Sequence, residues 1–142
     1  MTTLAADVLR DFQLGDLEEL PVIASDIIFA GAAVGENASG YSRPLQAGDA
    51  FQGFAMGKVD NSAGSAGDER VTVRRRGYVV LTVANASGVA VNDMTAVYAS
   101  DDNTFTTSPT SNSLIGWVSR WISGTDCVVY FDAFAVRAAL AA

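Results

Sequence analysis

Much of the chain alternates apolar and polar side chains with the period of two that is typical of β-strands. Residues 71–74 (VTVR) follow this pattern, and residues 78–84 (YVVLTVA) continue it after a glycine. Tyr78, Val80 and Thr82 are predicted on one face of the second segment. Because both of its faces are largely apolar, we expect this strand to lie centrally in a sandwich or barrel.

The clearest hairpin is predicted near the C-terminal end. Residues 114–122 alternate well and place Ile115, Trp117 and Trp121 on one face. Residues 125–134 (TDCVVYFDAF) alternate again after a turn at Gly124. Two alternating segments joined by a short glycine-containing turn are typical of a β-hairpin.

Shorter elements complete the predicted pattern. The sequence favours strands at 50–56, 95–99 and near 105, and one strand or two within 22–34. It favours loops at 36–44 and at 60–68 (DNSAGSAGD). Short strands about ten residues apart predict an all-β fold, either a barrel or a sandwich.

The N-terminal residues carry the only helical pattern. Apolar residues recur at helical spacing through residues 3–12, and Gly15 ends the pattern. A helix of about ten residues is marginal by itself in water, so it must pack on something. Packing on its own domain and docking as an arm on a neighbour both stay open.

Composition excludes several classes of function but says less about the fold. The chain has 142 residues, enough for one domain, and a net charge of −7, which argues against a nucleic-acid partner. It contains no histidine, so no Ser-His-Asp arrangement is possible, and its one cysteine, Cys127, lies in an apolar strand typical of packing. We therefore expect no enzyme, cofactor or metal ligand set.

The sequence shows neither the pattern of a signal peptide nor that of a membrane span. The first residues (MTTLAADVLRDF) carry acids where a signal peptide has basic residues and an apolar run. No segment approaches the ~20 apolar residues of a bilayer span. We expect synthesis in the cytoplasm and no membrane partner.

Acidic and basic clusters each allow two interpretations. Asp60, Asp68, Glu69, Asp101 and Asp102 flank predicted loops, where solvated turn residues are favoured over a calcium site, which stays open. Arg74, Arg75 and Arg76 form the one basic cluster, with alternation placing Arg74 and Arg76 on one face. They fit surface ion pairs or contact with an acidic partner.

The two tryptophans are equally ambiguous. Trp117 and Trp121 lie four residues apart in one predicted strand. Both fit core packing, and one of them fits an interface instead, since tryptophan is enriched at binding hot spots. The sequence leaves both roles open.

Residues 88–107 (GVAVNDMTAVYASDDNTFTT) and 111–131 (SNSLIGWVSRWISGTDCVVYF) together resemble the capsid decoration, or cement, proteins of bacteriophages. Segments 48–55 (GDAFQGFA) and 74–84 (RRRGYVVLTVA) look like earlier strands of that family, so the resemblance covers about residues 45–132. The individual motifs are glycine turns and apolar alternation, and their order carries the resemblance. The matching residues are Val89, Asn92, Asp93, Val97, Tyr98, Phe105, Thr106, Thr107, Leu114, Ile115, Gly116, Val118, Gly124, Val128 and Phe131.

The resemblance implies a small β-barrel-like or β-tulip-like domain that is usually trimeric and reinforces the outside of an icosahedral head. We expect this domain at residues 45–142, and an N-terminal arm with the first strands and a short helix at residues 1–44. The expected partners are the major capsid protein and further copies of the chain, and the expected location is the outer capsid surface of a virion.

A fibre-type or carbohydrate-binding β-module is the alternative function. For the capsid or subunit interface we predict a set of apolar, basic and aromatic side chains, namely Leu4, Val8, Phe12, Leu14, Arg74, Arg76, Trp117 and Trp121.

Overall fold

The computed structural model describes residues 5–7, 15–88 and 94–141. Strands dominate these ranges, and the prediction of an all-β chain with a small barrel is confirmed. The elements are β1 (Leu17–Pro21), β2 (Asp26–Ile28), β3 (Ala33–Glu36), β4 (Ser42–Pro44), β5 (Ala50–Ala55), β6 (Val59–Asn61), β7 (Arg70–Arg74), β8 (Arg76–Ala84), β9 (Ala96–Asp101), β10 (Thr104–Thr106), β11 (Ser113–Ser123), β12 (Asp126–Asp132) and α1 (Ala133–Ala141).

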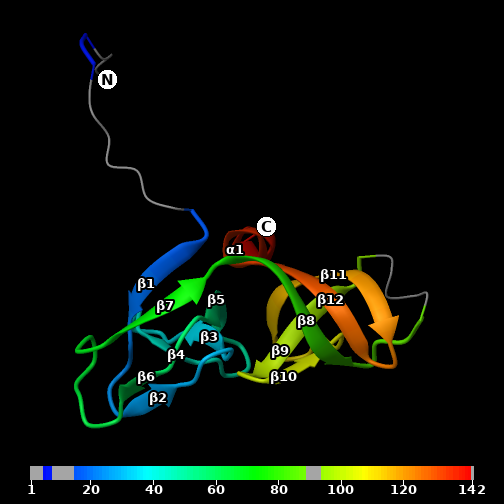
Figure 1. The fold of residues 1–142 in the computed structure, drawn as a ribbon, viewed down its shortest axis with the longest axis horizontal. Helices are drawn as coiled ribbons and strands as arrows, with labels where there is room; N and C mark the ends of the chain where they lie inside the picture. The colour runs from blue at the N-terminus through cyan, green and yellow to red at the C-terminus, as the bar shows by residue number, and fades with distance from the viewer. Residues whose placement is uncertain (1–4, 8–14, 89–93, 142) are drawn as a thin grey trace.

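The second half of the chain closes into a barrel in the strand order β10-β8-β12-β11-β9 (Figure 1). Neighbouring strands are antiparallel except for β10 and β8, which run parallel. The predicted hairpin over Gly124 is confirmed as β11 and β12, which pair antiparallel. Closure leaves the barrel without the unpaired strand edges of an open sheet.

The first half forms an open sheet beside the barrel, in the order β1-β7-β5-β3-β4, with β2 and β6 paired separately (Figure 1). Three of the strands within residues 17–44 pair with strands that come after residue 44: β1 with β7, β2 with β6, and β3 with β5. The predicted boundary follows residue 44, whereas the chain passes from the open sheet to the barrel at Arg75.

Aromatic side chains join the two sheets through one core. Phe51 and Phe54 of β5 belong to the same buried cluster as the barrel's Phe105 and Phe131. The rings of Phe54 and Phe131 lie edge to face, with centroids 4.8 Å apart, a favourable geometry for aromatic pairs. A smaller apolar cluster joins residues of the open sheet, such as Val34 and Val71, to Ile28 of β2 and to Val22. The barrel and the open sheet are therefore packed units of one molecule.

Three local predictions differ from the structure. The predicted loop at 36–44 contains β4, which pairs with β3 as a hairpin. Residues 5–7 of the predicted helix form an exposed bend, and the remainder of that helix lies outside the described residues. The third difference is β8, which has one exposed face because Tyr78 and Val80 are 69% and 61% exposed. Within the described ranges, no helix has the length and apolar character needed to cross a bilayer.

Candidate functional site

Three aromatic side chains lie in a row across the outer wall of the barrel. Trp117 of β11 pairs with Tyr130 of β12, and Tyr130 pairs with Tyr78 of β8. Directly paired residues of antiparallel strands present their side chains on the same face. The rings of Tyr78 and Tyr130 are tilted by 52°, with centroids 5.3 Å apart. We call Trp117, Tyr130 and Tyr78 the aromatic row.

Strand alternation turns Tyr130 and Tyr78 of this row away from the core. Val129 and Phe131 flank Tyr130 on β12, and both are buried inside the barrel. Successive side chains of a strand point to opposite faces, so Tyr130 is directed outward. Val80 follows Tyr78 on the same face of β8 and is also exposed. The outer wall therefore presents apolar and aromatic groups to solvent.

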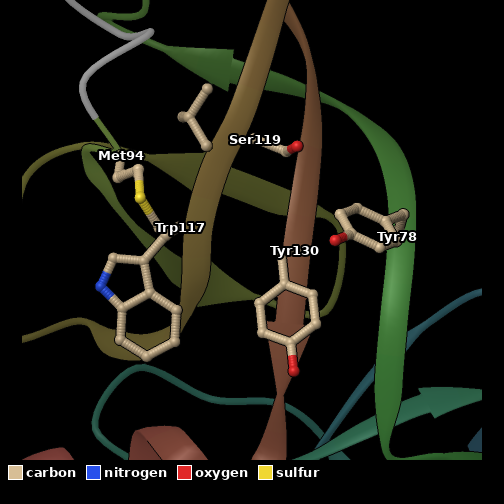
Figure 2. A pocket seen from close by; sticks show the side chains of 6 residues that line it. Tyr78, Met94, Trp117, Ser119 and Tyr130 are labelled. Atoms are coloured by element: carbon tan, nitrogen blue, oxygen red, sulfur yellow. The ribbon is translucent and has the colours of Figure 1, made fainter.

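A shallow hollow of about 320 Å³ lies over the row, bordered by Met94 (Figure 2). Met94 is 68% exposed. The pairing of β11 with β12 shifts between Val118 and Arg120, so Ser119 is an extra, unpaired residue. A bulge of this kind redirects a side chain, and Ser119 lines the hollow with the aromatic rings.

A hydrogen bond raises the pKa of Tyr130 in the aromatic row. The Tyr130 hydroxyl donates to Oδ2 of Asp132 at 2.9 Å, and this bond, with burial, raises the pKa of Tyr130. Oδ1 of Asp132 accepts the backbone N–H groups of Phe134 and Ala135, which caps α1. A neutral, hydrogen-bonded tyrosine suits contact better than proton transfer.

Opposite charges balance on the outer wall. Arg76 pairs with Asp132 in register, and Arg120 lies opposite Val128. Asp126 lies opposite Thr82 and accepts its hydroxyl at 2.8 Å. These two arginines and two aspartates sum to zero, whereas the whole chain carries −7. The charges on the outer faces of β8, β11 and β12 therefore balance, and Asp16, which pairs with Arg76, adds one negative charge beside them.

The structure separates the roles of the two tryptophans. Both are half-buried and pack against the barrel core. Trp117 also lines the hollow, whereas Trp121 donates from Nε1 to the carbonyl of Gly124 at 3.0 Å, across the hairpin turn. Of the two, Trp117 is the residue that belongs to the aromatic row.

The predicted arginines lie at the junction of the two sheets. Arg74 ends β7 and Arg76 begins β8, so they belong to different sheets although alternation predicts one shared face. Arg76 forms an exposed ion pair with Asp16 at 2.9 Å. The predicted interface residues Leu4, Val8, Phe12 and Leu14 lie outside the described residues.

The acidic loop residues hold turns together. Asp60 accepts the N–H of Ser62, and Asp68 accepts the N–H of Ser65. Asp101 likewise accepts the N–H of Asn103. In the part of the chain that the structure describes, no three metal-binding side chains come together.

The cysteine is a core residue. Cys127 is fully buried on β12, and burial raises the pKa of its thiol. Its predicted packing role is confirmed.

Sequence reasoning found Trp117 but not the grouping around it. The alternation predicts a strand face for Tyr78, but it does not predict the register that brings Tyr78 beside Tyr130. The sequence did contain a sign that these two faces point to solvent, because each also carries a polar residue. Thr82 shares a face with Tyr78, and Asp132 shares a face with Tyr130. Neither the models of known families nor the curated proteins include a match to this chain.

Proposed function

We propose that the protein is a structural virion component that binds the outer surface of an assembled bacteriophage capsid and stabilises it as a homotrimer. The observation that carries this proposal is the aromatic row on a closed barrel, where Tyr78 and the neighbouring Val80 are exposed and Trp117 and Tyr130 are half-buried. Tyrosine, tryptophan and methionine are enriched in protein interfaces, which favours a protein partner for this surface.

The row is proposed as the contact between copies. The charged side chains of β8, β11 and β12 beside the row sum to zero, so local repulsion there is weak, although the net charge of −7 on each copy still opposes association at long range. The resemblance to decoration proteins points to a capsid as the partner, and matching residues such as Val97, Leu114 and Phe131 lie in strands β9, β11 and β12 of the barrel. A trimer presents three capsid contacts at once and so gains avidity. A ligand that binds the assembled shell alone stabilises it by mass action.

Binding to heads tests this function directly. Purified protein is mixed with expanded heads that lack it, sedimented, and imaged by electron microscopy. We expect co-sedimentation, symmetric added density outside the shell, and heads that resist heating better. Heads that neither bind the protein nor gain stability would overturn the proposal.

The contact surface is tested with Tyr78→Arg and a control, Arg70→Gln, at the exposed first residue of β7. Tyr78→Arg places a charge in the apolar row, so we expect a monomer by light scattering and weak head binding. The control is expected to stay trimeric. A Tyr78→Arg protein that remains trimeric would rule out this surface as the contact between copies.

Carbohydrate binding is a second candidate, favoured by the same row. Aromatic rings exposed on a sheet can stack against the apolar face of a sugar ring. An affinity gel with immobilised polysaccharides separates the two functions, because retardation that Tyr78→Ser abolishes would favour a sugar, while head binding without retardation favours the capsid.

A further inference from the structure

A second pocket lies where the open sheet, the barrel and α1 meet. Its volume is about 300 Å³, close to the lower end of the range for small-molecule sites. Apolar groups from three elements form its walls, namely Leu20 of β1, Phe51 of β5 and Phe134 of α1. Arg75 and Arg137 line it as well. This pocket is distinct from the hollow over the aromatic row.

Arg75 is held in place at this pocket by its backbone. Its N–H donates to the carbonyl of Asp16 at 2.7 Å, and its carbonyl accepts the N–H of Ala133 at 2.9 Å. Its guanidinium lies over the ring of Phe134, 4.9 Å from the centroid. None of the ion pairs found among the described residues involves Arg75. The pocket therefore contains an oriented cation with no carboxylate bound to it in that part of the chain.

A buried amide forms the polar part of the wall. Gln52 is 6% exposed, and its Oε1 accepts the hydroxyl of Ser42 at 2.6 Å. Its Nε2 donates to Oε2 of Glu36 at 3.1 Å, and the same oxygen lies 3.7 Å from the guanidinium of Arg137. This chain of contacts orients Glu36 and, through it, Arg137 before any ligand arrives.

Charge and shape together define the ligand. Two guanidinium groups and one carboxylate line the pocket, which leaves one positive charge there in a protein whose net charge is −7. Arginine matches a carboxylate in geometry and can bind it with two parallel hydrogen bonds. Glu36 disfavours a doubly charged group such as phosphate, and the apolar walls favour a ligand with an apolar body.

We propose that this pocket binds a carboxylate carried on an apolar group, with Arg75 as the principal cation and Phe134 as the apolar cover. A free organic acid and the C-terminal residue of a peptide chain both have this chemistry. The proposal is independent of the capsid function, because it uses neither the aromatic row nor contact between copies.

Matched ligands test the carboxylate requirement on the full chain. N-acetyl-leucine and N-acetyl-leucinamide differ only in that the amide lacks the charge, and each is titrated against the ¹⁵N-labelled protein by NMR. We expect the acid to shift the amides of Arg75 and Phe134 and to bind at least about tenfold more tightly than the amide. Equal affinities, or no shifts with the acid up to about 10 mM, would refute the proposal.

Two pocket variants and one control locate the site. Arg75→Gln and Phe134→Ala are each expected to weaken acid binding about tenfold, whereas Arg70→Gln outside the pocket leaves it unchanged. Phe134 is 62% exposed, so its variant keeps the test valid even if Arg75→Gln unfolds the protein. Unchanged affinity in the Phe134 variant would overturn the assignment of this pocket.

A peptide arm distinguishes the two sources of carboxylate. A pentapeptide ending in leucine is titrated with a free C-terminus and with an amidated one. Tighter binding of the free peptide than of N-acetyl-leucine indicates a protein C-terminus as the ligand, and weaker binding indicates a small organic acid. A pentapeptide that binds equally well after amidation would argue against the carboxylate site.

Discussion

Valine has opposite roles on the two sides of the barrel wall. Val80 of β8 is 61% exposed on the outer face, whereas Val129 of β12 is fully buried. Replacing either by threonine keeps the shape and adds a hydroxyl. We expect Val80→Thr to change the free energy of unfolding by less than about 0.5 kcal/mol, since surface substitutions are usually neutral. Val129→Thr should lower the free energy of unfolding by about 2 kcal/mol, because the added hydroxyl is buried in the apolar core.

Urea denaturation of the two variants measures this difference, and the shared substitution controls for the change in β-propensity. Equal losses of stability would mean that Val80 is covered in solution. That outcome would in turn indicate that a partner or another copy already lies on the outer wall.

Cys127 lies on the inner face of the barrel, so the rate at which its thiol reacts measures how often the barrel wall opens. The thiol is buried, and desolvation followed by the charge of Asp126 raises its pKa, so the reactive thiolate is scarce at neutral pH. We expect an aromatic disulfide reagent to label the folded protein extremely slowly at pH 8 and the protein in guanidinium chloride at once. Rapid labelling of the folded protein would show that the barrel opens locally between β11 and β12.

At the scale of elements, Gly53 allows the passage from β7 to β8. Its φ is +132°, and a Cβ at this position would meet the carbonyl of Arg74. Gly31 also has a positive φ, of +84°, but nothing lies near its missing Cβ. We expect Gly31→Ala to cost roughly 1 kcal/mol from backbone strain alone, and Gly53→Ala clearly more, because the crossover must also shift.

Thermal unfolding of the two alanine variants tests this comparison. A methyl group on residue 53 would push away the carbonyl of Arg74, and Arg75 is the next residue. Gly53→Ala should therefore also weaken carboxylate binding in the second pocket. Similar unfolding free energies for both variants would show that the backbone between β7 and β8 can move to accept the added methyl group at little cost.

The sequence predicted strands well where alternation is regular and poorly where pairing breaks it. The pattern at 71–74 and 114–122 became β7 and β11, but β4 was missed because Ser42–Pro44 has no alternation and depends on pairing with β3. The strict faces expected for β11 fail, since Ile115 and Val118 are both buried. Shifts in register at Leu114–Gly116 and after Val118 explain this, and no single-strand pattern encodes them.

The candidate site shows the same limit. The sequence correctly places Tyr78, Val80 and Thr82 on one face of β8. It wrongly predicts that this face is buried, because an apolar face can either pack on a core or bind a partner. The grouping of Tyr78 with Tyr130 and Trp117 depends on the register of three strands. Register arises from the turn and from the packed face, so it appears only once the barrel is assembled.

At the scale of the molecule, the N-terminal residues can be removed in two informative places. A protein that begins at residue 15 keeps Asp16, its ion pair with Arg76, and the edge strand β1. A protein that begins at residue 21 loses these contacts and the packing of Leu20. We expect the first to melt within about 2 °C of the full chain and the second at least about 5 °C lower.

Circular dichroism measures both melting temperatures, and head binding of the first truncation tests the predicted arm. Weak head binding at unchanged stability would assign residues 1–14 to the capsid contact. A first truncation that melts as low as the second would instead place those residues in the fold.

Ionic strength distinguishes an apolar contact between copies from a contact made by charges. Each copy carries −7, so bringing three copies together is opposed by long-range repulsion, which salt screens beyond about 10 Å at 0.1 M. The aromatic row attracts by burial of apolar surface, which salt does not weaken, and exposed ion pairs at its rim contribute little. We therefore expect the trimeric fraction in sedimentation equilibrium to rise between about 20 mM and about 300 mM NaCl. A fall over this range would mean that Arg76 and Arg120 hold the copies together through Asp126 and Asp132, and that the row serves another partner.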